Sequence, residues 1–230
     1  MIGMRLLDGL RRCMLMSKQN AWLDKDVSWE WETNVNADSI IEELGIVKKD
    51  NVLDVGCGPG TYLNDIQKKT GAKSFGCDIR TDVFAANKNK KVKLIEGDML
   101  KLPYRAGFFD KLFSLGVLEH DPDHDRVFGE AARVLKKGGK ILLTVPNLFS
   151  FFHVTKHVKM LLGRWDVGYE ASFTIPGLKR LLQKQGLVVE KAYMTPHPEV
   201  RNVFNWMDNK MHGFNGERFG FFVRVVARKV

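Results

Sequence analysis

The sequence predicts an α/β fold in which a parallel β-sheet is covered by helices on both faces. From Asn51 to Val145, short apolar segments alternate with amphipathic ones, which is the pattern of consecutive strand–helix units. The first apolar segment, Val52, Leu53 and Val55, is apolar on both faces, as a buried parallel strand is. We therefore expect strands at residues 52–55, 73–77, 92–95, 109–114 and 140–145, with helices at 61–70, 81–86 and 125–135.

The segments on either side of this core are less regular. Residues 36–44 are expected to form a helix ended by Gly45, and residues 1–20 an amphipathic helix. The Lys-Lys-Gly-Gly run at 136–139 is expected to end the helix before it. After Pro146 we expect helices at 149–164 and 174–185, strands at 187–193 and 219–226, and a polar loop between these two strands.

Composition and charge limit the possible classes of protein. The 230 residues suit one domain with a single core, and no apolar run approaches the roughly 18 residues that span a bilayer. Charged residues interrupt the N-terminal apolar stretch and no small-residue cleavage site follows it, so we expect no signal peptide. The three cysteines lack metal-ligand spacing, which favours a cytoplasmic protein without a metal site.

The net charge of +9 lies mostly in the C-terminal third, where residues 151–230 carry 13 Lys and Arg against 6 Asp and Glu. This excess indicates either solvated helix faces or a surface that meets an anionic partner.

A glycine-rich loop follows the first strand. Gly56, Gly58 and Gly60 allow a sharp turn and a close approach of the backbone to a ligand, and Thr61 is expected to cap the helix that follows. Asp54 adds an acceptor at the strand end, so the chemistry indicates a polar nucleoside ligand. The alternatives are a tight turn without ligand or a dinucleotide-binding loop, although the latter uses Gly-x-Gly-x-x-Gly and this loop is Gly-x-Gly-x-Gly.

Three further features fall at the carboxyl ends of later strands, where open α/β sheets bind ligands. Asp78 stands 24 residues after Asp54 and could accept both hydroxyls of a ribose. The other two are the Gly-Asp-Met at 97–99 and the Leu-Gly-Val-Leu-Glu-His at 115–120. A dehydrogenase needs the glycine loop and Asp78 but has no use for this last pair.

The stretches LDVGCGPG, GDML followed by LP, and VLEH together resemble the motifs of class I S-adenosylmethionine-dependent methyltransferases, of the type 11 group that is similar to UbiE and UbiG. The resemblance implies a Rossmann-like mixed sheet of seven strands whose last strand is antiparallel. It also implies one methyltransferase domain over residues 1–230, with N-terminal cap helices in 1–45, a cofactor-binding core in 46–146, and a substrate-side insertion with terminal strands in 147–230.

The resemblance also implies how S-adenosylmethionine would be bound. Asp54 would fix the methionine ammonium and Asp78 the ribose, although both could merely cap turns. The other contacts implied are Gly56, Gly58 and Gly60 beneath the cofactor, Ile79 on one adenine face unless it is core, Asp98 and Met99 at the adenine edge, and the Leu115 carbonyl near the ammonium.

Methyl transfer requires mainly the alignment of a nucleophile, with a base where the acceptor is poorly acidic. His120 is the candidate catalytic base, and its alternative role is packing at a helix start. Ser-Leu-Gly ends the fourth strand in place of the Asn/Asp-Pro-Pro-Tyr/Phe pattern of nucleic-acid base methyltransferases, so no DNA partner is expected. A cofactor-binding protein without catalysis, or an RNA-associated one, stays an alternative.

The helix expected at 149–164 concerns the acceptor. An apolar stripe (Phe151, Val154, Val158 and Leu161) is edged by cations (Lys156, His157, Lys159 and Arg164). This pattern suits a small-molecule acceptor that is anionic or amphiphilic, or contact with a membrane surface. The alternative is a lid that packs its apolar stripe on the sheet and leaves its cations in water. The sequence predicts no oligomeric state.

Overall fold

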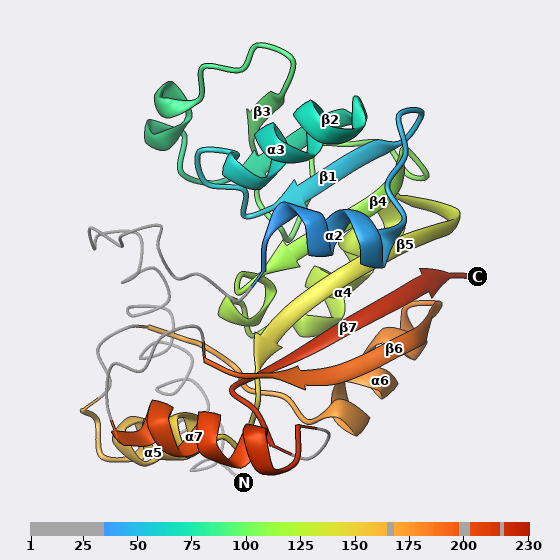
Figure 1. Ribbon diagram of the computed structural model, residues 1–230. Coiled ribbons are helices and arrows are strands. Elements are labelled where there is room, and N and C mark those ends of the chain that lie inside the picture. The colour runs from blue at the N-terminus through green and yellow to red at the C-terminus, as the bar shows by residue number, and fades with distance from the viewer. Residues whose placement is uncertain (1–34, 165–167, 198–202, 217–218) are drawn as a thin grey trace, which may run out of the picture.

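The computed structural model describes residues 35–164, 168–197, 203–216 and 219–230. A seven-stranded sheet in the order β3-β2-β1-β4-β5-β7-β6 runs through it (Figure 1). The strands are β1 (Asn51–Val55), β2 (Lys73–Asp78), β3 (Lys93–Glu96), β4 (Phe109–Leu115), β5 (Leu135–Pro146), β6 (Leu187–Thr195) and β7 (Phe222–Lys229).

The pairing of these strands confirms the predicted mixed sheet. β1 to β5 pair in parallel, whereas β7 is antiparallel to both β5 and β6. The predicted Rossmann-like sheet of seven strands, with the last one antiparallel, is therefore confirmed. A dehydrogenase sheet of six parallel strands does not fit.

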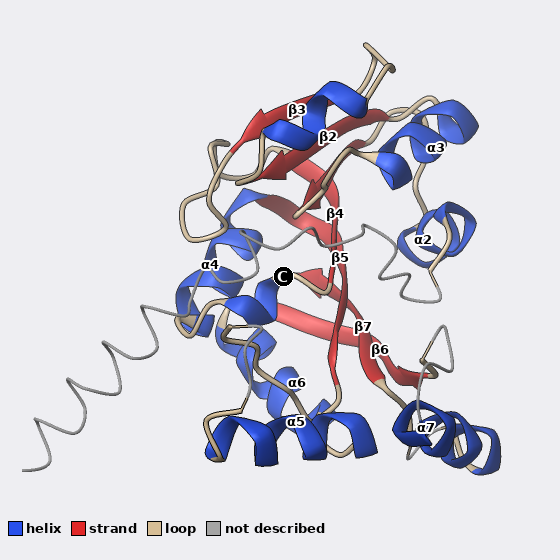
Figure 2. Ribbon diagram, turned by 90° about the vertical axis from the view of Figure 1, so that its left-hand side faces the viewer, coloured by secondary structure: helices blue, strands red, loops and turns tan. Residues whose placement is uncertain are grey.

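Helices cover both faces of the sheet, as Figure 2 shows with the sheet seen nearly edge-on. α2 and α3 lie on one face and α4 and α6 on the other, and each pair closes its own apolar core. The helices are α2 (Ala37–Leu44), α3 (Thr61–Thr70), α4 (His124–Val134), α5 (Phe151–Leu161), α6 (Ile175–Lys184) and α7 (Val203–Phe214), with short 3₁₀ helices η1 (Asp82–Ala86) and η2 (Leu118–His120).

Local sequence signals explain several helix ends. The Asn36 side chain accepts from the Ser39 N–H at the start of α2, and Gly45 ends that helix in the left-handed conformation. Thr174 in the same way accepts from the Gly177 N–H at the start of α6. These caps are the reason that both helices begin where the sequence predicts.

Two predictions about secondary structure are wrong. Residues 136–139 do not end a helix, because β5 begins at Leu135 directly after α4 and pairs there with Phe109. The expected polar loop between β6 and β7 contains α7. Its polar residues misled the prediction because they are the ones that α7 buries, as Asp208 shows below.

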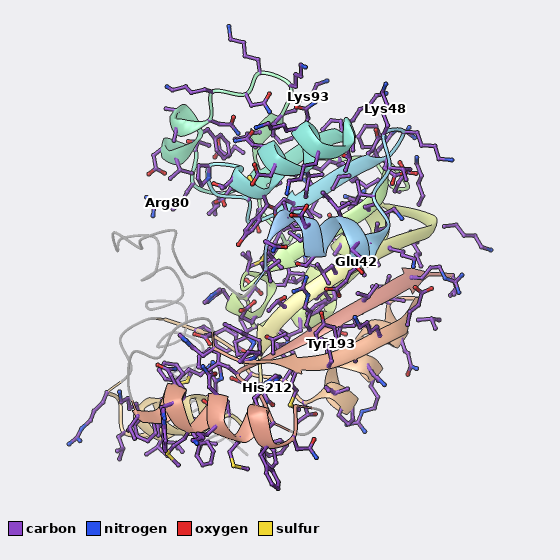
Figure 3. The ribbon with its side chains drawn as sticks, viewed as in Figure 1. Glu42, Lys48, Arg80, Lys93, Tyr193 and His212 are labelled. Carbon is purple, nitrogen blue, oxygen red and sulfur yellow. The ribbon has the colours of Figure 1, made fainter. Side chains whose placement is uncertain are left out.

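α7 and α2 are tied to the outer strands by buried polar contacts. His212 of α7 places Nε2 3.2 Å from the Met194 carbonyl oxygen of β6. The Tyr193 hydroxyl of β6 donates to Glu43 Oε1 of α2 at 2.8 Å, and Arg224 Nη2 of β7 lies 3.0 Å from the same oxygen. Figure 3 labels Tyr193 and His212. Together these contacts join β6 to α7, and join β6 and β7 to α2.

The N-terminal helix predicted at 1–20 and the tryptophans Trp22, Trp29 and Trp31 lie outside the described residues. The division of residues 1–230 into cap, core and insertion stays a prediction. Within the described ranges, no helix is both long and apolar enough to cross a membrane.

Candidate active site

The glycine loop joins β1 to α3 at the carboxyl edge of the sheet. Gly56, Gly58 and Gly60 all have positive φ, at 79°, 49° and 78°. A Cβ at Gly56 would come within 2.3 Å of Val117 Cγ2, which lies after β4. Glycine is therefore required at this position by conformation and by the close approach of a second strand-end segment.

The start of α3 corrects one expectation. Gly60, not Thr61, is the N-cap, and within the described chain no side chain caps this helix. The first N–H groups of α3 therefore face the glycine loop without a capping carboxylate or hydroxyl.

Asp78 ends β2 beside this loop. Its Oδ2 accepts from the Gly58 N–H at 2.8 Å, and its Oδ1 accepts from the Arg80 N–H at 2.9 Å. The turn-capping role considered from the sequence is thus real, and it places a buried carboxylate against the glycine loop. Its contact with a ribose stays a prediction.

Asp54 is buried near the end of β1, one strand away from Asp78. Burial, reinforced by the Asp78 carboxylate, raises the pKa of Asp54 well above its usual range. Two carboxyl groups that share a water-poor edge are best accommodated when a cation lies next to them. This pair therefore suits a cationic ligand such as an ammonium group.

The residues predicted to meet the adenine lie on the loops after β2 and β3. Ile79 is 45% exposed, so it is not the core residue that the alternative supposed. Asp98 is exposed and its Oδ1 accepts from the Leu100 N–H at 2.8 Å, which forms a turn beside the half-buried Met99. α4 holds this loop, because Glu130 Oε2 accepts from the Leu102 N–H at 2.9 Å.

The segment after β4 completes the edge. Leu115 is half-buried at the strand end, and the Gly116 N–H donates to the Thr144 carbonyl of β5 at 2.9 Å. His120 Nδ1 lies 3.0 Å from the Tyr169 carbonyl oxygen. Because a carbonyl only accepts, this contact puts the proton of the neutral ring on Nδ1 and leaves Nε2 as the acceptor nitrogen.

Glu119 is a site residue that the sequence prediction missed. It is 2% exposed, and its Oε2 has no hydrogen-bond partner among the described residues. Burial, reinforced by the Glu170 carboxylate, raises the pKa of Glu119 to about 8. The available signal was a glutamate between the apolar Leu118 and His120, shortly after the end of a strand. From the sequence, the catalytic base was assigned to the neighbouring His120 instead.

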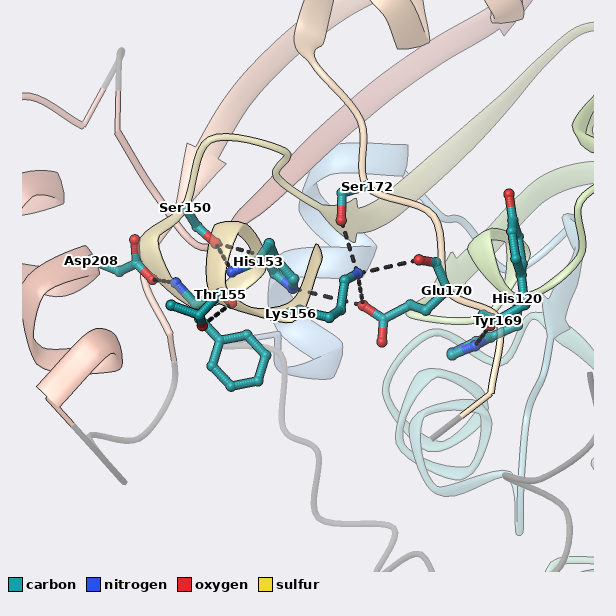
Figure 4. Close-up of polar contacts among 10 residues, drawn as sticks. His120, Ser150, His153, Thr155, Lys156, Tyr169, Glu170, Ser172 and Asp208 are labelled. Atoms are coloured by element: carbon teal, nitrogen blue, oxygen red, sulfur yellow. Dashed lines mark hydrogen bonds and ion pairs between the residues drawn. The ribbon is translucent and has the colours of Figure 1, made fainter. Parts of the chain in front are cut away.

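A buried polar cluster lies on α5 and on the segment before α6 (Figure 4), and that segment is bonded to Glu119 through the Ala171 N–H, which donates to the Glu119 carbonyl at 2.9 Å. Lys156 Nζ contacts Glu170 Oε1 at 2.9 Å and Ser172 Oγ at 2.9 Å. His153 Nδ1 lies 2.6 Å from Ser150 Oγ, and burial holds the pKa of His153 well below its usual range. Lys156 is therefore not the acceptor-facing cation expected from the sequence, because Glu170 already pairs with it inside the protein.

α5 is also turned the other way from the lid that we considered as an alternative, which would bury its apolar stripe and expose its cations. Its apolar residues Val154, Val158 and Leu161 are exposed, and it packs inward through His153 and Lys156. Among the described residues, no group of three or more His, Cys, Asp or Glu side chains could hold a metal ion.

The edge can thus hold a nucleoside-containing cation. The glycines admit a ligand close to the backbone, Asp78 supplies acceptor oxygens, Asp54 supplies a carboxyl group whose ionised form a neighbouring cation would favour, and Ile79 and Met99 supply apolar surface. These features fit S-adenosylmethionine, whose methionine ammonium and sulfonium are positive. Glu119 Oε1 lies 3.7 Å from where a Cβ would stand at Gly116, which places an acid beside the same edge.

Comparison with known proteins agrees with this geometry. Residues 53–143 match the family model described as a methyltransferase domain. The chain is 33% identical over 199 residues to a sterol 24-C-methyltransferase of Pneumocystis carinii, which covers 79% of this chain and 49% of the relative. It is 26% identical over 198 residues to a demethylmenaquinone methyltransferase of Staphylococcus aureus, covering 75% of this chain and 82% of the relative.

A solved structure shares the fold. Geranyl diphosphate C-methyltransferase from Streptomyces coelicolor superposes with a TM-score of 0.63 at 17% identity, covering 84% of this chain and 78% of the other. The chain spans less than half the length of the first curated relatives that it matches. The resemblance noted in the sequence is confirmed, and so is the fold that it implied.

Proposed function

We propose that this chain, which resembles the class I S-adenosylmethionine-dependent methyltransferases of the type 11 group and matches a methyltransferase-domain family model over residues 53–143, transfers a methyl group from S-adenosylmethionine to a small-molecule acceptor. The observation that carries the proposal is the convergence of four strand ends on one edge. Val117, from the segment after β4, packs on Gly56 of the first loop, and Asp78 of β2 binds Gly58 of the same loop.

The binding roles follow from position and charge. Asp78 would receive the ribose hydroxyls, and Asp54 the methionine ammonium together with the Leu115 carbonyl. Ile79 would cover an adenine face, while Asp98 and the Met99 N–H would meet its polar edge. The cofactor supplies an activated methyl group on a positively charged sulfur, so the protein needs chiefly to align the nucleophile in line with that bond.

Two residues are proposed for proton transfer. His120 presents Nε2 as a proton acceptor, because the Tyr169 carbonyl fixes the proton on Nδ1. Glu119 is the second, since a carboxyl group whose pKa lies near neutral pH can take a proton from an acceptor hydroxyl, amine or carbon acid. A cationic ligand beside Glu119 would favour its ionised form and make it a base at neutral pH.

The names of the relatives favour a lipid-soluble acceptor. One acts on a sterol and another on demethylmenaquinone, both of which are apolar molecules. We propose that the acceptor is apolar or amphiphilic and that any negative charge lies in its head group. We also propose that the protein is cytoplasmic and works at a membrane surface. We propose no DNA partner, because the pattern of base methyltransferases is missing after β4.

The test supplies the purified chain with methyl-labelled cofactor and either the lipid extract or the aqueous extract of host cells. We expect label in a lipid-extractable product, and much less of it with Asp78→Ala at cofactor concentrations near the wild-type dissociation constant, because the cofactor site of this variant is incomplete. Cofactor binding without any labelled product would favour the non-catalytic alternative. Label in the nucleic-acid fraction would favour the RNA-associated one.

A further inference from the structure

Two helices of this protein pack with their polar faces inward. α5 buries His153 and Lys156, and α7 buries Asn205 and Asp208. Each buried group has a partner nearby or a role in holding the helices: Asp208 accepts from the N–H groups of Phe151 and Phe152 at 2.8 and 3.2 Å. These contacts fix the rotation of both helices about their axes, so the outward faces are set by the buried polar groups.

The outward faces are consequently apolar. They carry Val154, Val158 and Leu161 on α5 and Val203, Trp206 and Phe214 on α7, here called the α5/α7 face. Leu161 is 87% exposed and Phe214 is 84% exposed. Most of the large apolar side chains that the described part of the chain exposes lie on or next to these two helices. An exposed apolar surface of this kind marks an interaction site when its side chains adjoin one another.

The two helices form one surface. Asp208 of α7 sits at the N-terminus of α5, and Figures 1 and 2 both place α5 and α7 next to each other at the end of the molecule away from β3, with α7 lying across one end of α5. Single exposed apolar residues occur on any protein, but two adjacent helices with the same inverted pattern gather such residues at one end of the molecule, here called the platform.

The charges on this platform are positive. Lys159 on α5 and Lys210 on α7 are exposed, as is Arg164 just after α5. Asp208 is the only acidic residue in the two helices, and it is buried against α5. A second copy of the chain would bring like charges together, which disfavours self-association through this face. Cations around exposed apolar and aromatic side chains instead match an anionic bilayer surface.

We infer that the α5/α7 face docks on the surface of an anionic lipid bilayer, inserting its apolar side chains among the acyl chains while Lys159, Lys210 and Arg164 meet the lipid head groups. This inference extends the proposed function, because docking would bring the active site to acceptors dissolved in lipid. It also stands apart from that function, since lipid binding needs no methyl transfer.

The test is co-sedimentation of the full chain with vesicles of phosphatidylcholine that contain phosphatidylglycerol, against vesicles of phosphatidylcholine alone. We expect binding to the anionic vesicles that weakens as salt is raised. Leu161→Glu/Trp206→Glu should lower the partition coefficient by roughly tenfold or more, because each change puts a carboxylate into the inserted face. The matched control is Val47→Glu/Val188→Glu, which puts two carboxylates at exposed valines elsewhere, 49% and 43% exposed, and should bind as the wild type does.

Calorimetry with S-adenosylmethionine on the same variants separates the two proposals. Unchanged cofactor affinity together with lost vesicle binding supports the docking face. Docking is overturned if the wild type fails to bind anionic vesicles at low salt, or if the control variant loses as much binding as the face variant. It is also overturned if the wild type is a dimer that Leu161→Glu/Trp206→Glu dissociates and no vesicle binding occurs, since the occupant is then a second copy. Vesicle binding that persists when cofactor binding is absent would retain docking and reject methyl transfer.

Discussion

The carboxyl edge of β1 to β4 and the pair α5 and α7 use polar residues in opposite ways. At the edge, apolar strands form the core and the acids Asp54 and Asp78 stand where each strand ends. In the helix pair, Lys156 and Asp208 are buried, and residues such as Leu161 and Trp206 are exposed. The first region is the ordinary arrangement for a soluble core with a ligand at its rim, and the second is its inverse.

The difference shows what decides the orientation of an amphipathic helix. An apolar stripe predicts burial only when the surface that it meets is apolar too. α5 instead meets Glu170, Ser172 and the acidic Asp208 of α7, so its polar groups gain partners by facing inward. An unpaired buried lysine or aspartate would cost far more than several exposed apolar side chains.

The largest effect is expected from breaking the buried ion pair. Lys156→Met leaves the Glu170 carboxylate without its cation and should lower the free energy of unfolding by about 3–5 kcal/mol. Urea denaturation measures this, with the exposed Lys159→Met as control. Adding Glu170→Leu to Lys156→Met should recover most of the loss, because removing both charges leaves no unpaired group. Equal stabilities of Lys156→Met and Lys159→Met would mean that the Lys156–Glu170 pair does not hold α5 in its orientation.

At the sheet edge, the matching break is Gly56→Ala. The new Cβ would overlap Val117 and the positive φ would be strained by about 1–2 kcal/mol. We expect cofactor affinity measured by calorimetry to fall more than tenfold. Gly56→Ala/Val117→Ala removes the overlap but keeps the strain, so it should recover only part of the affinity. Full affinity in Gly56→Ala would take the glycine loop out of the site.

The pH dependence of stability sharpens the role of Glu119, which joins the two regions. Its pKa of about 8 in the folded protein lies above the ordinary 4.5, so the fold favours the protonated form. The stabilising contribution of Glu119 to the free energy of unfolding is fully present below pH 4.5. It is lost as the pH rises towards 8, with a slope of up to about 1.4 kcal/mol per pH unit.

Glu119→Gln keeps the shape and removes the titration. Urea denaturation at pH 5.5, 6.5 and 7.5 should therefore show the wild type losing stability relative to Glu119→Gln as pH rises. A constant difference across that range would contradict a raised pKa for this carboxyl group.

The smallest expected effect comes from the side-chain cap at the start of α2. Asn36→Ala removes the acceptor for the Ser39 N–H and should cost about 1 kcal/mol of unfolding free energy. Asn36→Asp, which keeps a capping oxygen, should stay close to the wild type. Thermal denaturation would show the order, and an unchanged melting temperature in Asn36→Ala would mean that α2 is held by its packing alone.

The sequence was sufficient to predict the sheet because its signals are local. Strand periodicity, glycine at positive φ and a cap such as Thr174 depend on nearby residues, and the acids at the strand ends follow from topology. Gly56 and Asp78 could therefore be assigned to one edge before the structure was known, although their ligand contacts stay predictions.

The rest depended on contacts between distant segments. The burial of Lys156 depends on Glu170, and α7 in its polar stretch is held by the N-terminus of α5. That Glu119 Oε2 has no hydrogen-bond partner among the described residues depends on all the segments packed around it. Val117 had no signal of its own, because its importance comes only from packing on Gly56. Such pairings have no sequence period, so no local pattern could predict them.

The most direct test of the account is calorimetric titration of the wild type, Asp78→Ala and Asp82→Ala with S-adenosylmethionine. The wild type should bind one equivalent, and Asp78→Ala should bind about 10- to 150-fold more weakly, as expected for the loss of a charged hydrogen-bond acceptor. Asp82 lies four residues further on and is exposed, so its alanine variant should bind as the wild type does. No binding by the wild type, or the same affinity in Asp78→Ala, would contradict a cofactor site at this edge.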